Sequence, residues 1–249
     1  MNKVARLFFV ALIPVILGIA SAQAGAQQIA LQNVALVETS SSVLAMSTTN
    51  DVIYSDGDET NDSGGSRLVE AEPMAVPRGV AAYGPFRVLD SGHAALVDVT
   101  GPSAPAQFSA MLHDFPGIKT LELIECPGTD DDRANLKLGR MIHARGLATN
   151  VPDGGSVRSG GVELFLAGVR HTAAKGAEFA VHSWADDTGH EAADFSADSP
   201  ENRAYLDYYR DMGMAADQAK KFYAMTNSVP NAQAKWLSAS DMGHWVSVN

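Results

Sequence analysis

From residue 85 onward, the chain alternates between short apolar runs and longer runs with helical spacing. Strands are predicted where β-branched and apolar residues gather or alternate, and helices where apolar residues recur every three or four positions. The predicted strands are FRVLD (86–90), AALVDVT (94–100), KTLELIEC (119–126), LATNVP (147–152) and AEFAVHSW (177–184). This alternation predicts an α/β domain with a mainly parallel sheet covered by helices.

The predicted helices have recognisable ends. Ser199 is placed to cap a helix whose first residue is Pro200, and Gly146 follows the last apolar residue of another. The last helix can be capped by Ser238 or Ser240. The predicted helices span 105–117, 132–146, 159–168, 199–213, 216–226 and 238–246.

The first 24 residues have the pattern of a secretory signal peptide. Lys3 and Arg6 precede an apolar run at 7–20, and Ala22-Gln23-Ala24 offers small residues at the spacing that a signal peptidase recognises. A membrane anchor is the alternative, but the run is short and contains Pro14 and Gly18. We expect a periplasmic or secreted protein with no stable membrane insertion after cleavage.

The segment 25–84 is predicted to be flexible, since 38–66 is rich in Ser, Thr, Asp, Asn and Gly. It contains DSGGS (62–66), which resembles the nucleophile motif of chymotrypsin-type proteases. Those enzymes need two β-barrels mostly upstream of the motif, so we interpret this match as chance. The domain organisation predicted is 1–24 signal peptide, 25–84 flexible segment and 85–249 one α/β domain.

Charge and cysteine usage exclude several function classes. The formal net charge is −11 and basic residues are not clustered, which argues against nucleic acid as a partner. Cys126 is the single cysteine, so an internal disulfide is impossible. The acidic stretch 182–191 fits no zinc spacing, and we expect neither a metal nor a cofactor.

Two predicted strand-to-helix joints carry glycine, at ECPGTDD (125–131) and RSGG (158–161). Ser159 could be a nucleophile with His182 as its base, and the N–H groups of Gly128 and Gly160 could bind an oxyanion. From the residues alone, the default interpretation is that Ser159 is a helix cap and His182 a partly buried, hydrogen-bonded strand residue. Lys175 is an alternative base but lies in a polar loop, and acidic neighbours disfavour a Cys126 thiolate.

CPGT, RSGGVELFLAG and RHTAAKGAEFAVHSW, in this order, resemble the Clp protease/crotonase superfamily over residues 85–249, most of all a secreted, Clp-peptidase-like branch. The resemblance implies oxyanion glycines at Gly128 and Gly160, a nucleophile at Ser159 and a base at His182. It also implies a homo-oligomer, because C-terminal helices in this superfamily often pack between subunits.

The chain departs from the family pattern in two places. The turn after CPG carries Thr129 and three aspartates, which would oppose a developing oxyanion unless they point to solvent. The aspartate expected before a run such as KWLS (235–238) is missing, and Asn231 is the nearest residue able to accept from a histidine N–H.

Three functions therefore stay open. The first is an exported serine hydrolase of the peptidase type. The second is an inactive or weakened homologue that binds peptide or a partner protein in the cell envelope. The third is a structural envelope subunit. Whether the chain is an enzyme is decided by the geometry at Ser159.

Overall fold

A computed structural model describes residues 74–249. The predicted signal peptide and the polar stretch 38–66 lie outside the described residues. Strand β1 begins at Ala81, ahead of the domain boundary predicted at residue 85. Within 74–249, no helix is both long and apolar enough to cross a membrane.

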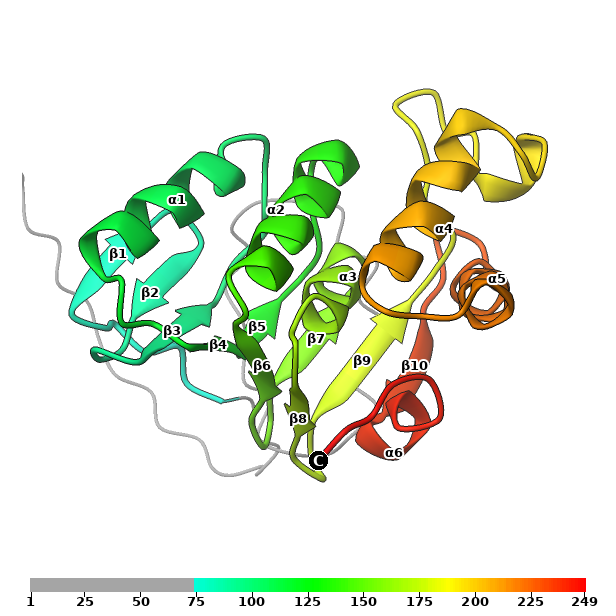
Figure 1. The fold of residues 1–249 in the computed structure, drawn as a ribbon. Helices are drawn as coiled ribbons and strands as arrows, with labels where there is room; N and C mark the ends of the chain where they lie inside the picture. The colour runs from blue at the N-terminus through cyan, green and yellow to red at the C-terminus, as the bar shows by residue number, and fades with distance from the viewer. Residues whose placement is uncertain (1–73) are drawn as a thin grey trace, which may run out of the picture. The chain divides into compact units, whose positions relative to one another are not determined.

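Two sheets form the centre of the domain (Figure 1). The larger has the strand order β1-β2-β3-β4-β6-β8, with parallel pairing from β3 to β8 and antiparallel pairing of β1, β2 and β3. Its strands are β1 (Ala81–Tyr83), β2 (Phe86–Val88), β3 (His93–Leu96), β4 (Thr120–Leu123), β6 (Ala148–Val151) and β8 (His171–Ala173).

The smaller sheet has the order β10-β9-β7-β5, in which only β10 is antiparallel to its neighbour. Its strands are β5 (Glu125–Cys126), β7 (Ser156–Arg158), β9 (Glu178–Val181) and β10 (Lys235–Ser238). The mainly parallel α/β architecture predicted from the sequence is confirmed.

Helices cover both sheets and enclose one large apolar core (Figure 1). Ser199 caps α4 by accepting from the Asn202 N–H, and Ser238 caps the last helix, as the sequence predicts. The helices are α1 (Ala104–Asp114), α2 (Asp132–Ala144), α3 (Gly160–Leu166), the 3-10 turn η1 (Ala192–Asp194), α4 (Pro200–Asp211), α5 (Ala216–Thr226) and α6 (Ala239–Met242).

The run KTLELIEC, predicted as one strand, is two strands in two different sheets. The chain passes from β4 to β5 at Ile124, whose N–H donates to the Leu96 carbonyl oxygen at 3.1 Å. Strands β1, β7 and β8 were not predicted, because each has only three residues and no alternation can be recognised over so short a run.

The smaller sheet brings the candidate residues together. Strands β5, β7 and β9 are parallel neighbours, so their carboxyl ends lie at the same edge. Gly128 follows β5 by two residues, Ser159 directly follows β7, and His182 directly follows β9. In parallel sheets this is the edge where ligands bind.

Candidate active site

Ser159 has a strained backbone. Its φ of 49° and ψ of −127° make it the only residue other than glycine with a positive φ among residues 74–249. Its N–H donates to the Ala180 carbonyl oxygen at 2.9 Å, which ties the turn to β9. The hydroxyl makes no capping hydrogen bond to α3. Ser159 therefore does not act as a helix cap, and such strain is characteristic of functional turns.

Gly128 and Gly160 surround this turn. Gly128 has a φ of +143°, and a Cβ atom there would lie 3.2 Å from the Cβ atom of Ser159. A Cβ atom at Gly160 would lie 2.7 Å from Cγ2 of Thr129. Within the part of the chain that the structure describes, neither glycine N–H donates to a protein acceptor. Both N–H groups are thus available to an acceptor on a ligand.

A buried polar network holds the two glycine segments in place. The Asn135 side-chain amide donates to the Gly160 carbonyl oxygen at 2.7 Å, and its oxygen accepts from the Thr100 hydroxyl at 2.9 Å. The Thr100 N–H donates to the Gly128 carbonyl oxygen at 3.1 Å. Helix α2 thereby fixes the Gly128 turn relative to the start of α3.

The His182 ring is oriented by the main chain. Its Nδ1 atom lies 2.9 Å from the Ser183 carbonyl oxygen, which can only accept, so Nδ1 carries the proton. Nε2 then holds the lone pair that a general base requires.

Asn231 lies beside His182 with its nitrogen rather than its oxygen toward the ring. The Asn231 Nδ2 atom is 3.1 Å from His182 Nδ1 and donates to the Ser183 carbonyl oxygen at 2.9 Å. Two donors thus converge on one main-chain oxygen. In this geometry Asn231 supports the acceptor of the histidine proton and does not itself accept that proton.

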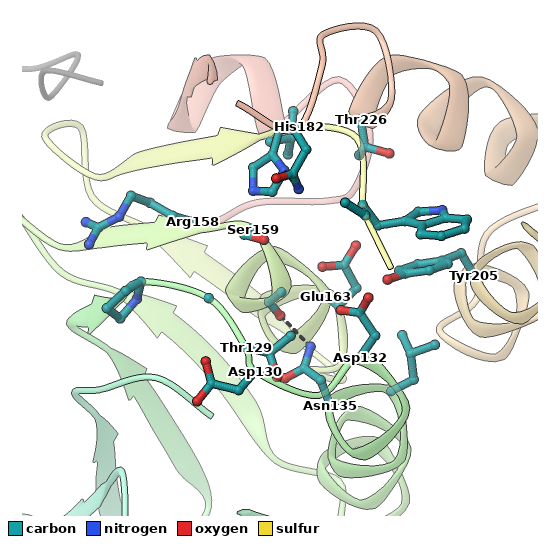
Figure 2. Close-up of a pocket in the computed structure, with 18 of the residues that line it drawn as sticks. Thr129, Asp130, Asp132, Asn135, Arg158, Ser159, Glu163, His182, Tyr205 and Thr226 are labelled. Carbon is teal, nitrogen blue, oxygen red and sulfur yellow. Dashed lines mark hydrogen bonds between the residues drawn. The ribbon is translucent and has the colours of Figure 1, made fainter. Parts of the chain in front are cut away.

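One cavity of about 740 Å³ contains every site residue proposed from the sequence. Its lining includes Gly128, Ser159, Gly160, His182 and Asn231. Figure 2 shows the carboxylates of Glu163 and Asp132 pointing into the same part of this cavity, between Ser159 and Tyr205. The cavity thus combines a serine, a histidine, two free N–H groups and a pair of acids.

Burial affects both acids. Desolvation raises the pKa of Glu163 to about 7, although the Tyr209 hydroxyl donates to it at 2.7 Å. Desolvation also raises the pKa of Asp132, against the opposing effect of a hydrogen bond from Tyr205. Charge repulsion from Asp132 adds to the raised pKa of Glu163, and charge repulsion from Asp131 adds to that of Asp132.

The other two aspartates of the TDDD run are not part of the Glu163–Asp132 pair. Asp131 caps α2 by accepting from the Ala134 N–H at 2.8 Å. Asp130 is exposed at the cavity rim. Of the three aspartates, Asp132 is the one that lies beside Glu163 in the cavity, and desolvation raises its pKa.

The alternative nucleophile, Cys126, and the alternative base, Lys175, do not line the cavity. Cys126 is buried, and desolvation places the pKa of its thiol well above the usual value. Lys175 is exposed and does not line the cavity.

Sequence inspection missed Thr100, Asn135 and Glu163. Asn135 lies three residues before Leu138 on the buried face of α2, and a buried amide on an apolar face was a signal that could have been used. Glu163 gave a signal of the same kind, because it is the one charged residue in the buried helix α3.

No protein-family model matches the chain, and no curated protein matches its sequence. Among solved structures, it is similar to a mutant of the 1510-N membrane-bound stomatin-specific protease in complex with a substrate peptide. Identity is 14% and the TM-score 0.40, over 61% of this chain and 74% of that one. It is also similar to a ClpP1 mutant from Listeria monocytogenes, at 16% identity and a TM-score of 0.43, over 64% of this chain and 90% of that one. The residue roles proposed below rest on the geometry of this chain.

Proposed function

We propose that this chain is a serine hydrolase of the peptidase type, exported through its N-terminal signal peptide. The observation that carries the proposal is Ser159, held at a φ of 49° with a hydroxyl that does not cap its own helix. A serine that only caps a helix does not require this backbone strain, which costs about 1–3 kcal/mol.

The chemistry follows from the positions of the groups. The Ser159 hydroxyl attacks the carbonyl carbon of the substrate while Nε2 of His182 takes the hydroxyl proton. The N–H groups of Gly128 and Gly160 donate to the oxyanion. His182 then gives the proton to the leaving amine, and an acyl ester remains on Ser159. Water, deprotonated by His182, hydrolyses that ester and regenerates the serine.

The third member of the site is the Ser183 carbonyl oxygen, which accepts the Nδ1 proton of His182. Asn231 donates to the same oxygen and holds it in place. Asn231→Ala should therefore reduce the rate by no more than about tenfold, because the tautomer is set by the main chain. Losing a residue that sets the tautomer itself costs about 10⁴-fold in serine proteases.

Labelling by a fluorophosphonate probe tests the proposal. The mature protein without residues 1–24 should be labelled, and both Ser159→Ala and His182→Ala should lose the label. Ser103→Ala is a matched control, since Ser103 also precedes a helix without making a capping hydrogen bond. A folded wild type that takes no label, or a label that survives Ser159→Ala, contradicts the proposal.

The second candidate is a peptide-binding protein without catalysis. It is favoured by Asn231, which places its nitrogen rather than an accepting oxygen beside the His182 ring. The hydrolase is preferred because the Ser183 carbonyl oxygen already accepts the Nδ1 proton. A second copy of this chain is the partner expected for either candidate, and sedimentation of the mature protein tests for it.

A further inference from the structure

The proposed active site has a strongly acidic interior. Four carboxylates line the cavity, those of Asp98, Asp130, Asp132 and Glu163. Arg158 is the only lysine or arginine in that lining, and its guanidinium is paired with Glu125 at 2.7 Å. Figure 2 shows Arg158 extending away from Asp132 and Glu163.

Among residues 74–249, Glu163 and Asp132 have no lysine or arginine partner, although the charge of His182 lowers the pKa of Asp132. Glu163 is only 7% exposed, yet neither it nor Asp132 forms an ion pair with a lysine or arginine among residues 74–249. Among residues 74–249, their side-chain hydrogen-bond donors are tyrosine hydroxyls. Tyr209 donates to Glu163, and Tyr205 donates to Asp132. Burying a carboxylate without a counter-charge is unfavourable, and a cation brought by a ligand would remove that penalty.

The wall next to this pair is aromatic. Trp184, Tyr205 and Tyr223 line the cavity, and the Trp184 and Tyr205 rings are stacked with centroids 6.2 Å apart and planes 10° apart. The Trp184 indole N–H donates to the Tyr223 hydroxyl at 2.7 Å, which fixes the ring. Aromatic faces attract alkylammonium and guanidinium groups and pack against their methylene chains.

We propose that this part of the cavity binds the lysine or arginine side chain of the peptide residue whose carbonyl group Ser159 attacks. The inference rests on the proposed function and adds a substrate class to it. Asp132 and Glu163 supply the counter-charge, and Trp184 and Tyr205 supply the wall. An acidic or bulky apolar side chain at that position is disfavoured, because it would leave both carboxylates unpaired in a desolvated space.

Binding can be measured apart from catalysis. Calorimetric titration of the mature Ser159→Ala protein with n-butylamine and n-butylguanidine, which copy the two side chains, should give saturable binding, whereas n-butanol should not bind. Asp132→Asn and Glu163→Gln keep the shape and remove charge, and each should weaken amine binding about tenfold or more. Asp207→Asn, on the exposed face of α4, is the matched control. Equal binding of amine and alcohol, or binding that survives both substitutions, overturns the inference.

Reactivity provides the second measurement. Two peptidyl phosphonates that differ only in carrying lysine or norleucine at the reacting position should label the wild type at rates that differ by about tenfold or more at pH 8. The ratio of the two rates should fall as the pH drops below about 7, because Glu163 then takes up a proton.

The two proposals fail in different ways. If neither phosphonate reacts but the amine binds through Asp132 and Glu163, the hydrolase is wrong and the cation pocket stands. If the norleucine reagent reacts as fast as the lysine reagent, the pocket is wrong and the hydrolase stands.

Discussion

The side-chain amide of Asn135 donates a 2.7 Å hydrogen bond to the carbonyl oxygen of Gly160, the first residue of α3. Its oxygen accepts from the Thr100 hydroxyl, and Thr100 in turn binds the Gly128 turn. Asn135 is 2% exposed, so solvent does not replace these hydrogen bonds. One amide therefore connects the two turns that carry the proposed oxyanion donors.

Asn135→Ala should lower the free energy of unfolding by about 1–3 kcal/mol, because it removes two buried hydrogen bonds, one to the Gly160 carbonyl oxygen and one from the Thr100 hydroxyl. Urea denaturation measures the loss. The rate of fluorophosphonate labelling should fall as well, since both turns become free to shift. Lys137→Ala, at an exposed position of the same helix, should stay within about 0.5 kcal/mol of the wild type. An Asn135→Ala protein as stable as the wild type would contradict the proposed connection.

Relief of the backbone strain at Ser159 should raise stability, and loss of its hydroxyl should abolish labelling. Ser159→Gly removes a positive-φ strain of about 1–3 kcal/mol at an entropic cost of about 0.5–1 kcal/mol. We therefore expect Ser159→Gly to unfold at higher urea than Ser159→Ala, while neither variant is labelled. At Ser103, where φ is −86°, the order should reverse, with glycine less stable than alanine. The same order at both sites would show that Ser159 is unstrained.

Glu163 makes stability depend on pH in a defined direction. The folded state holds its proton up to about pH 7, whereas the carboxyl group in the unfolded chain has a pKa near 4.5. Between these values the folded protein binds the extra proton, so the free energy of unfolding falls as pH rises. The shift corresponds to a loss of about 3 kcal/mol that is complete above pH 7.

Glu163→Gln should remove this loss. The variant should match the wild type near pH 4.5 and exceed it at pH 8, as measured by urea denaturation at both values. Glu201→Gln, at an exposed position in the first turn of α4, controls for the loss of one negative charge. A wild type that gains stability relative to Glu163→Gln as the pH rises would reverse the sign and refute the assignment.

The sequence predicted the parallel α/β architecture because its strands and helices have clear periodicity and strong end signals such as Ser199-Pro200. The division of KTLELIEC between two sheets was not predicted, although the alternation is interrupted at the adjacent apolar residues Leu123 and Ile124. That division depends on a long-range hydrogen bond to Leu96, which no local pattern encodes.

The sequence predicted those residues of the site that directly follow predicted strands or mark glycine turns. Ser159, His182, Gly128 and Gly160 follow three strands that turn out to be neighbours, and glycine marked two of the turns. The acidic pair was not foreseen, because Glu163 has the spacing of an ordinary helical position. Its importance comes from burial, which is created by the packing of α3 against α2 and by the hydroxyl groups of Tyr208 and Tyr209 on α4.

Gly160 and Thr129 form a close contact that can be tested by compensation. A Cβ atom at Gly160 would lie 2.7 Å from Thr129 Cγ2, so Gly160→Ala should destabilise the fold by about 1–3 kcal/mol and slow labelling. Thr129→Ser removes that methyl group and keeps the hydroxyl, which donates to the Thr100 carbonyl oxygen at 2.9 Å.

The double variant Gly160→Ala with Thr129→Ser should therefore be more stable than Gly160→Ala alone. The rescue should be partial, because the added Cβ atom would still lie 3.0 Å from Asn135 Nδ2. Gly92→Ala, where the new Cβ atom meets only a side-chain oxygen at 3.6 Å, sets the cost of alanine without a clash. If Thr129→Ser gives no rescue, contact with the Thr129 methyl group is not the cause of the lost stability. The requirement for glycine at position 160 would then have another origin.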